Sequence, residues 1–215
     1  MEKKMKRQKK TESIFIIAVI IVAAVILAYS LAALSRTSVS KAVAEVNGHD
    51  ITEQDLQEVM ITVPEQLRAN LTRDTLIQQA INLEIIMQEA GKAGIAVSSQ
   101  EVEDSITGTL KSVGMTMQDF SKAAKQQGIS EETMKNAYKK QLTALRFVNQ
   151  TILSRITVSE DEIKSTYSIY SSQLNLTYDA AKPEVEYALR IQKGQLALQD
   201  LLQQKRQEYS ITVLS

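Results

Sequence analysis

The sequence predicts a mainly α-helical protein in which an apolar N-terminal segment precedes one multi-helix domain. Three observations support this fold class: six helix-start motifs at helix-length spacing, one long apolar run, and β-prone segments at both ends of the domain. The motifs predict a helical block closed by a long C-terminal helix. The β-prone segments predict a small two-stranded sheet that joins the start and the end of the domain.

The six helix-start motifs share one pattern. An apolar residue precedes Ser or Thr, and a second apolar residue follows four positions after that hydroxyl. The hydroxyl can accept a hydrogen bond from the third helical N–H, and in three of the last four motifs a carboxylate at that third position can accept one in return. The motifs are ITEQDL (51–56), LTRDTL (71–76), VSSQEV (97–102), MTMQDF (115–120), ISEETM (129–134) and VSEDEI (158–163).

Each motif predicts a helix, and the residues that follow predict where it ends. Pro64 disfavours helical backbone at Val63, and glycines in left-handed conformation are common helix terminators. The expected helices run from Thr52 to about Val63, from Thr72 to Gly91–Gly94, from Ser98 to Gly114, from Thr116 to Gly128, from Ser130 to about Arg155 and from Ser159 to about Leu174.

The end of the chain predicts one more helix and a strand. Residues 175–182 read as a polar connection, and Pro183 suits the first turn of a long helix that reaches about Tyr209. Ala42–Val46 predicts a strand that turns at Asn47-Gly48 and returns through His49–Ile51 before the first helix. Ile211–Leu214 is β-prone and needs a neighbouring strand, so we expect it to pair with Ala42–Val46.

The N-terminal segment predicts a membrane anchor. Residues 13–34 are almost wholly apolar, and about 20 such residues cross a bilayer core of roughly 30 Å. Residues 1–12 are basic, which places them in the cytoplasm, with residues 35–41 as a tether and the domain at 42–215 outside the cell membrane. The alternative is a cleaved signal peptide, for which Ser30-Leu-Ala32 offers a small-residue site.

Composition excludes several function classes. The first twelve residues carry six basic and two acidic side chains, a net of +4, so the rest carries −4 because the whole chain sums to zero. That acidic body argues against nucleic-acid binding. The absence of cysteine excludes disulfides and thiolate metal sites. No Gly-rich phosphate loop is present for ATP, and we expect no cofactor or metal.

The candidate catalytic groups have simpler interpretations. His49 is the only histidine, and beside the Asn47-Gly48 turn it reads as an exposed loop residue. The carboxylates cluster in first helical turns, where they complement the helix dipole. General acid–base catalysis by a carboxylate pair is the alternative. Three N-glycosylation sequons begin at Asn70, Asn149 and Asn175; the last lies in a predicted loop, and Asn149 lies within a predicted helix.

Methionine and aromatic side chains form the candidate peptide-binding surface. Flexible thioethers adapt to varied partners, and tyrosine adds contact area with a polar tip. Ordinary core packing is the alternative, and it is the preferred interpretation for Met87 and Met134. The predicted contact residues are Met117, Phe120, Tyr138, Tyr167 and Tyr170.

Five segments resemble the N-terminal domain of the SurA and PrsA class of extracytoplasmic chaperones. They are VAEVNGHDIT (43–52), LIQQAINLEIIMQEAGKAGIAVSSQEVE (76–103), GMTMQDFSKAAKQQGISEETMKNAYKKQL (114–142), SRITVSEDEIKSTY (154–167) and KPEVEYALRIQKGQLALQDLLQQKRQEYSITVL (182–214). The resemblance implies a domain that cradles unfolded polypeptide. Relatives usually carry parvulin prolyl-isomerase domains between the last two helices, and residues 175–182 are too few for one.

The predicted function is therefore a membrane-anchored, extracytoplasmic, ATP-independent holdase for unfolded or newly secreted polypeptides. A non-catalytic envelope adaptor that binds one specific partner is the alternative. Isomerase activity is not expected, because the insert and its histidines are absent. The sequence leaves the client, the exact peptide contacts and the oligomeric state open.

Overall fold

The computed structural model describes residues 41–63, 68, 71–126, 128–174 and 176–214. The predicted basic segment (1–12), the predicted anchor (13–34), the tether up to residue 40 and the sequons' Asn70 and Asn175 lie outside these residues. Among the residues that are described, no helix combines the length and the apolar character needed to cross a membrane. The described chain forms two compact units, one up to Thr143 with Ser210 onward, the other from Ala144 to Tyr209.

The first unit contains an antiparallel sheet in the order β2-β1-β3. Strand β1 (Ala42–Val46) pairs with β2 (His49–Thr52) through a turn in which Asn47 and Gly48 have φ of 54° and 80°. Positive φ at both central positions suits the right-handed twist of a hairpin. Strand β3 (Ile211–Val213) pairs with the other edge of β1, which confirms that the start and end of the domain meet.

The sequence analysis predicted a two-stranded sheet, but the sheet has three strands. The return segment after the turn forms a full ladder with β1, with Val46 opposite His49 and Ala44 opposite Ile51. It continues until Thr52, where the side chain caps the first helix. His49 therefore lies in a strand and not in a loop, although its side chain is exposed as predicted.

The helices of the first unit begin where the sequence motifs predict. They are α2 (Glu53–Thr62), α4 (Arg73–Lys92), α5 (Ser99–Ser112), α6 (Met117–Gln126) and the part of α7 (Glu131–Phe147) up to Thr143. All six predicted N-cap hydroxyls accept the expected N–H bond. These bonds join Thr52 to Asp55, Thr72 to Thr75, Ser98 to Glu101, Thr116 to Asp119, Ser130 to Thr133 and, in the second unit, Ser159 to Glu162.

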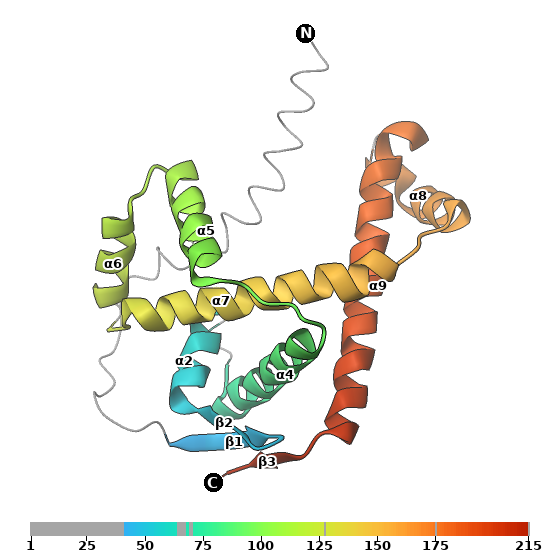
Figure 1. Cartoon of the computed structure of the whole chain (residues 1–215). Helices are drawn as coiled ribbons and strands as arrows, with labels where there is room; N and C mark the ends of the chain where they lie inside the picture. The colour runs from blue at the N-terminus through green and yellow to red at the C-terminus, as the bar shows by residue number, and fades with distance from the viewer. Residues whose placement is uncertain (1–40, 64–67, 69–70, 127, 175, 215) are drawn as a thin grey trace. The chain divides into compact units, whose positions relative to one another are not determined.

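The core of the first unit lies on both sides of α7. Figure 1 shows α2 and α4 between the sheet and α7, and α5 and α6 on the far side of α7. Ile51, Ile81 and Ile85 are almost completely buried. On the far side, a second apolar cluster joins α5, α6 and α7 around buried residues such as Leu110, Phe120 and Met134.

The second unit begins with the end of α7. The sequence analysis predicted one continuous helix from Ser130 to about Arg155, but the helix type changes along this segment. The chain is α-helical to Phe147, π-helical over η1 (Val148–Ile152) and 3₁₀-helical over η2 (Leu153–Arg155). The Thr151 hydroxyl donates to the Phe147 carbonyl and the Ser154 hydroxyl to the Gln150 carbonyl, at 2.7 and 2.6 Å. Such back-bonding competes with regular helix bonds and accompanies the change of helix type.

Two helices complete the second unit, α8 (Glu160–Leu174) and α9 (Tyr178–Glu208). The predicted start of the last helix at Pro183 was wrong, because α9 begins five residues earlier and contains Pro183 within it. Ala181, 1% exposed, and Tyr178 pack against α8, and this packing stabilises helical backbone ahead of the proline. Further along α9, Gly194 approaches Leu153 so closely that a side chain at this position would collide with it.

Candidate functional site

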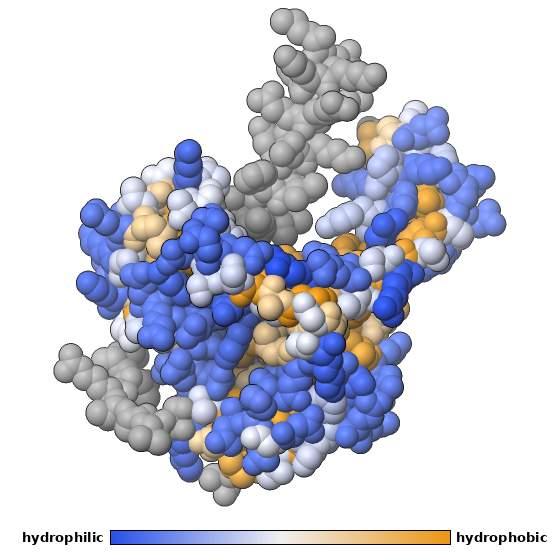
Figure 2. Space-filling view, viewed as in Figure 1, coloured by the Kyte–Doolittle hydropathy of each residue, from blue (hydrophilic) through white to orange (hydrophobic). Residues whose placement is uncertain are grey.

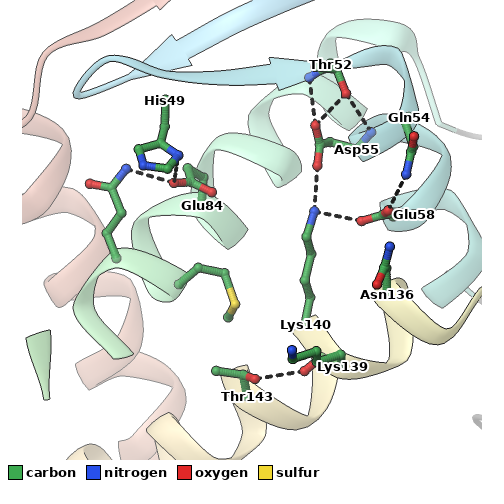
Figure 3. A pocket seen from close by; sticks show the side chains of 12 residues that line it. His49, Thr52, Gln54, Asp55, Glu58, Glu84, Asn136, Lys139, Lys140 and Thr143 are labelled. Carbon is green, nitrogen blue, oxygen red and sulfur yellow. Dashed lines mark hydrogen bonds and ion pairs between the residues drawn. The ribbon is translucent and has the colours of Figure 1, made fainter. Parts of the chain in front are cut away.

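The first unit has a polar pocket of about 670 Å³ (Figure 3). Strand β2 and helices α2, α4 and α7 supply its walls. The lining residues are His49, Thr52, Gln54, Asp55, Glu58, Glu84, Met87, Gln88, Asn136, Lys139, Lys140 and Thr143. Most of these side chains are polar or charged, so the electrostatics of the pocket depend on how their charges are paired.

Lys140 holds the two carboxylates of α2 together. Its ammonium group lies 2.5 Å from Asp55 Oδ1 and 2.7 Å from Glu58 Oε2. The Asp55 carboxylate also completes the cap of α2, since its Oδ2 accepts from the Thr52 N–H and hydroxyl. Glu58 is only 3% exposed, and Gln54 donates to its other oxygen at 3.1 Å. The clasp formed by Asp55, Glu58 and Lys140 therefore ties α2 to α7.

The clasp shifts the ionisation of its members toward their charged forms. Burial raises the pKa of Asp55, but hydrogen bonds from Lys140 and Thr52 outweigh burial and hold this pKa below its ordinary value. Burial lowers the pKa of Lys140, but the two carboxylates outweigh it and hold this pKa above its ordinary value. Neither pKa moves toward neutral pH, where a general acid or base functions best.

Two other polar groups of the pocket, Gln88 and Glu84, are hydrogen-bonded to each other. The Gln88 amide donates to the Val46 carbonyl and to Glu84, at 3.0 and 2.8 Å. His49 Nδ1 lies 3.8 Å from Glu84, and the histidine side chain is 74% exposed. The described residues contain no group of three His, Cys, Asp or Glu that could hold a metal ion. The capping interpretation of Asp55 is confirmed, and the structure adds an ion pair that the sequence analysis missed.

Three of the five predicted peptide-contact residues lie in the apolar cluster of α5, α6 and α7. Phe120 is 6% exposed, whereas Met117 and Tyr138 are partly buried at the edge of the cluster. The Tyr138 hydroxyl lies 3.0 Å from the Ser105 hydroxyl. Met134 is buried in the same cluster, as predicted, and Met87 lines the polar pocket.

The other two predicted contact residues lie on α8 and differ in environment. Tyr167 is partly buried against the core of the second unit, donates to the Leu176 carbonyl at 2.6 Å, and meets the Tyr178 ring edge-on at 5.4 Å. Tyr170 is 48% exposed. The two residues are three positions apart on one helix, but only the first is covered by its own chain.

Sequence reasoning missed two exposed apolar residues that are close to Tyr170 in the chain. Ile169 is 66% and Leu176 44% exposed. We call Ile169, Tyr170 and Leu176 the connection surface, because the first two lie in the last two turns of α8 and the third lies in the connection from α8 to α9. Figure 2 shows apolar side chains at the surface over α8. The sequence carried one signal for this surface, an uncharged run from Ser165 to Tyr178.

Fold and site together define a mainly helical module on a small antiparallel sheet, with a polar pocket closed by ion pairs and an apolar surface on its second unit. The chain belongs to the family of the SurA-like N-terminal domain, which matches residues 1–148. The resemblance drawn from sequence segments is therefore confirmed. No parvulin domain lies between α8 and α9, because only residues 175–177 join these helices.

Similar proteins include several that are named Chaperone SurA. The protein from Salmonella typhimurium is 24% identical over 183 residues, which cover 78% of this chain and 43% of that protein. The protein from Escherichia coli O157:H7 is 25% identical over 154 residues, 65% and 36% of the two chains. The protein from Hahella chejuensis is 24% identical over 141 residues, 62% and 32%. The chain thus spans less than half the length of these relatives.

A solved structure has a similar fold. It comes from work on PEB4 and Cj1289, described as two structurally related SurA-like chaperones of Campylobacter jejuni. The TM-score is 0.58 at 16% sequence identity, and the match covers 80% of this chain and 98% of the other. At this identity the likeness concerns the fold.

Proposed function

We propose that this protein is an extracytoplasmic, ATP-independent chaperone that holds unfolded or newly secreted polypeptides. Membership of the SurA-like family supports the chaperone class. The observation that carries the proposal is the connection surface, where three large apolar side chains are 44–66% exposed. Three large exposed apolar side chains within eight residues of the chain favour an interaction site.

The mechanism is reversible coverage of apolar segments. Burying the exposed part of one such side chain contributes about 1–2 kcal/mol. Ordering a disordered client costs conformational entropy that offsets several of these contacts. We therefore expect weak binding that protects a client by occupancy, without turnover and without nucleotide.

The five predicted contact residues have different roles in this proposal. Tyr170 and Met117 touch the client, because they are respectively exposed and partly exposed. Phe120, Tyr138 and Tyr167 support the surfaces from behind, since each packs in an apolar cluster of its own unit.

A retained N-terminal anchor completes the proposal. Residues 13–34 would cross the cell membrane, with residues 1–12 in the cytoplasm and the domain outside. Protease added to intact, wall-stripped cells should digest the domain and leave a small N-terminal fragment. Full protection of the domain would refute this orientation. The intact mass of the purified protein distinguishes a retained anchor from a cleaved signal peptide.

Aggregation assays test the chaperone function directly. The full-length chain, purified in a detergent or nanodisc that keeps it dispersed, should delay aggregation of several unrelated unfolded clients at near-stoichiometric ratios. Added ATP should change nothing, and a proline peptide should isomerise at its spontaneous rate. Protection of one client only would favour the adaptor alternative, and protection of none would refute the holdase function.

A further inference from the structure

The uncharged run from Ser165 to Tyr178 sets the end of α8 apart from the rest of the domain. It is fourteen residues long in a chain that is 23% charged, and the next longest uncharged run after residue 41 is nine residues, 75–83. Seven of the fourteen are Tyr or Ser. Tyr and Ser dominate antibody paratopes, because tyrosine supplies rigid contact area and serine supplies adaptable hydrogen bonds.

The fold of the second unit does not use the connection surface. Its core consists of Ile163, Ala181 and Val185, with Tyr167 and Tyr178 packed against them. Hydrogen bonds from Tyr167 to the Leu176 carbonyl and from Tyr178 to Glu160 fasten the connection. The side chains of Ile169 and Tyr170 lie outside this core and remain exposed. They are therefore available to a partner without unfolding the helices.

The sequence on both sides of the uncharged run is acidic. Residues 160–164 and 179–186 contain six carboxylates and two lysines, and Arg190 and Lys193 pair with two of these carboxylates, Glu186 and Glu162, which leaves a net of −2. Lys182 pairs with Glu160, whereas no ion pair joins Asp161, Asp179 or Glu184 to another residue of the described chain. These last three side chains are exposed.

Tyr178 lies beside one of these carboxylates. Its hydroxyl donates to Glu160 at 2.7 Å. That hydrogen bond, together with burial and the neighbouring carboxylates, raises the pKa of Tyr178 to about 12. The exposed carboxylates Asp161, Asp179 and Glu184, which have no ion pair in the described chain, favour a positive charge beside them over a negative one.

We infer that the connection surface binds extended polypeptide segments in which an uncharged apolar or aromatic centre is flanked by Lys or Arg. The centre covers Ile169, Tyr170 and Leu176, and the flanking cations lie beside Asp161, Asp179 and Glu184. This inference rests on the proposed chaperone function and adds a client preference to it. An anionic membrane surface is the competing partner for exposed tyrosines, and the unpaired carboxylates Asp161, Asp179 and Glu184 disfavour it.

The absence of Trp from the chain allows a direct test. The variant Tyr170→Trp introduces a single fluorescent reporter in the connection surface, and Tyr187→Trp is the control, since Tyr187 is 58% exposed on α9 outside the uncharged run. The full chain is reconstituted in phosphatidylcholine vesicles. It is titrated with two Trp-free peptides that share one Phe/Leu/Tyr centre and carry either Lys or Glu flanks.

The Lys-flanked peptide should shift the Tyr170→Trp emission to shorter wavelength and leave the Tyr187→Trp emission unchanged. It should bind more tightly than the Glu-flanked peptide by a factor of about 3 to 30, the effect of two or three surface ion pairs. At about 1 M salt the Debye length falls to roughly 3 Å and the difference should vanish. Equal affinity for both peptides, or equal shifts at both reporters, would overturn the inference.

Two further arms separate this inference from its alternatives. A shift of the Tyr170→Trp emission on adding phosphatidylglycerol to the vesicles, without peptide, would mean that the surface docks on lipid and would overturn the inference. In aggregation assays, the double variant Ile169→Ser/Tyr170→Ser should protect a Lys-rich client less than the control Leu196→Ser does, where Leu196 is 56% exposed on α9. Full protection by the double variant would sink the inference while the chaperone function stands.

Discussion

Replacing Lys140 by Met tests whether the clasp in the polar pocket stabilises the first unit. The substitution keeps most of the aliphatic stem and removes the ammonium group between Asp55 and Glu58. Asp55 retains its hydrogen bonds from Thr52. Glu58 is 3% exposed, and its Oε2 has no hydrogen-bond donor among the described residues apart from the ammonium group 2.7 Å away. The variant therefore leaves a buried carboxylate oxygen without its counter-charge.

The expected loss follows from the burial of the three side chains. Removing one member of a buried ion pair costs about 3–5 kcal/mol. The side chains of Lys140 and Asp55 are 30% and 27% exposed, so water screens one side of the clasp. We expect a loss of about 2–3 kcal/mol in the free energy of unfolding, because partial solvation reduces the cost. For a domain of this size that lowers the unfolding temperature by about 4–12 °C.

Thermal unfolding of the full chain, followed by circular dichroism at neutral pH, measures this loss. Lys139→Met is the matched control, because Lys139 is the exposed neighbour on the same helix and its substitution should change stability by less than about 0.5 kcal/mol. The double variant Lys140→Met/Glu58→Gln should regain more than half of the loss, since a neutral amide needs no counter-charge.

The pH dependence gives an independent check. The pKa of Asp55 is depressed, so its contribution is present above the unfolded value of 3.8 and is lost as pH falls through the lower folded value. The pKa of Lys140 is raised, so its contribution is complete below 10.5 and is lost as pH rises through the higher folded value. The stability difference between wild type and Lys140→Met should be widest between these limits. A variant as stable as Lys139→Met, or a double variant no better than the single one, would refute the reasoning.

Three further predictions concern the helices and the sheet. Tyr167→Ser should destabilise the second unit by about 1–3 kcal/mol, because it removes a partly buried aromatic side chain that packs against the core, while Tyr170→Ser should change stability by less than about 0.5 kcal/mol in the same denaturant titration. Hydrogen bonds from Lys193 and from the Ser159 cap lower the pKa of Glu162 to about 2. Its ionised form should therefore stabilise the folded chain above pH 4.5, and this stabilisation should be lost as pH falls to about 2. In Glu162→Gln, the free energy of unfolding should fall less steeply with pH in this window. Deleting residues 211–215 removes the outer partner of β1 and should lower the unfolding temperature; an unchanged transition would show that β3 contributes no stability.

The parts of the fold that were predicted from sequence depend on contacts between residues close in the chain. Each N-cap bond joins residues three apart, such as Ser98 and Glu101, so its partners are visible in one motif. The turn at Asn47-Gly48 is equally local. These short-range hydrogen bonds explain why all six motif-based helix starts agree with the structure.

The features that were missed depend on tertiary packing. Lys140 and Asp55 are 85 residues apart, and nothing in either motif pairs them. The helix through Pro183 forms because Ala181 and Tyr178 pack against α8, which outweighs the local preference of proline for a helix start. Local chemistry could suggest Tyr170 as a contact residue, but its exposure could be established only from the folded chain.

Three apolar residues along α8 connect the exposure of Tyr170 with a binding function. Ile163, Tyr167 and Tyr170 recur at spacings of four and three, which places them on one face of the helix. The first two are covered by α9, and the third is not. Folding of the described chain therefore explains the apolar character of the first two positions but not of the third. Residues whose type is not explained by the packing of the fold tend to lie at functional sites. An aromatic side chain at position 170 gains free energy only when something outside the second unit's own core covers it, which is the condition that a client-binding surface must meet.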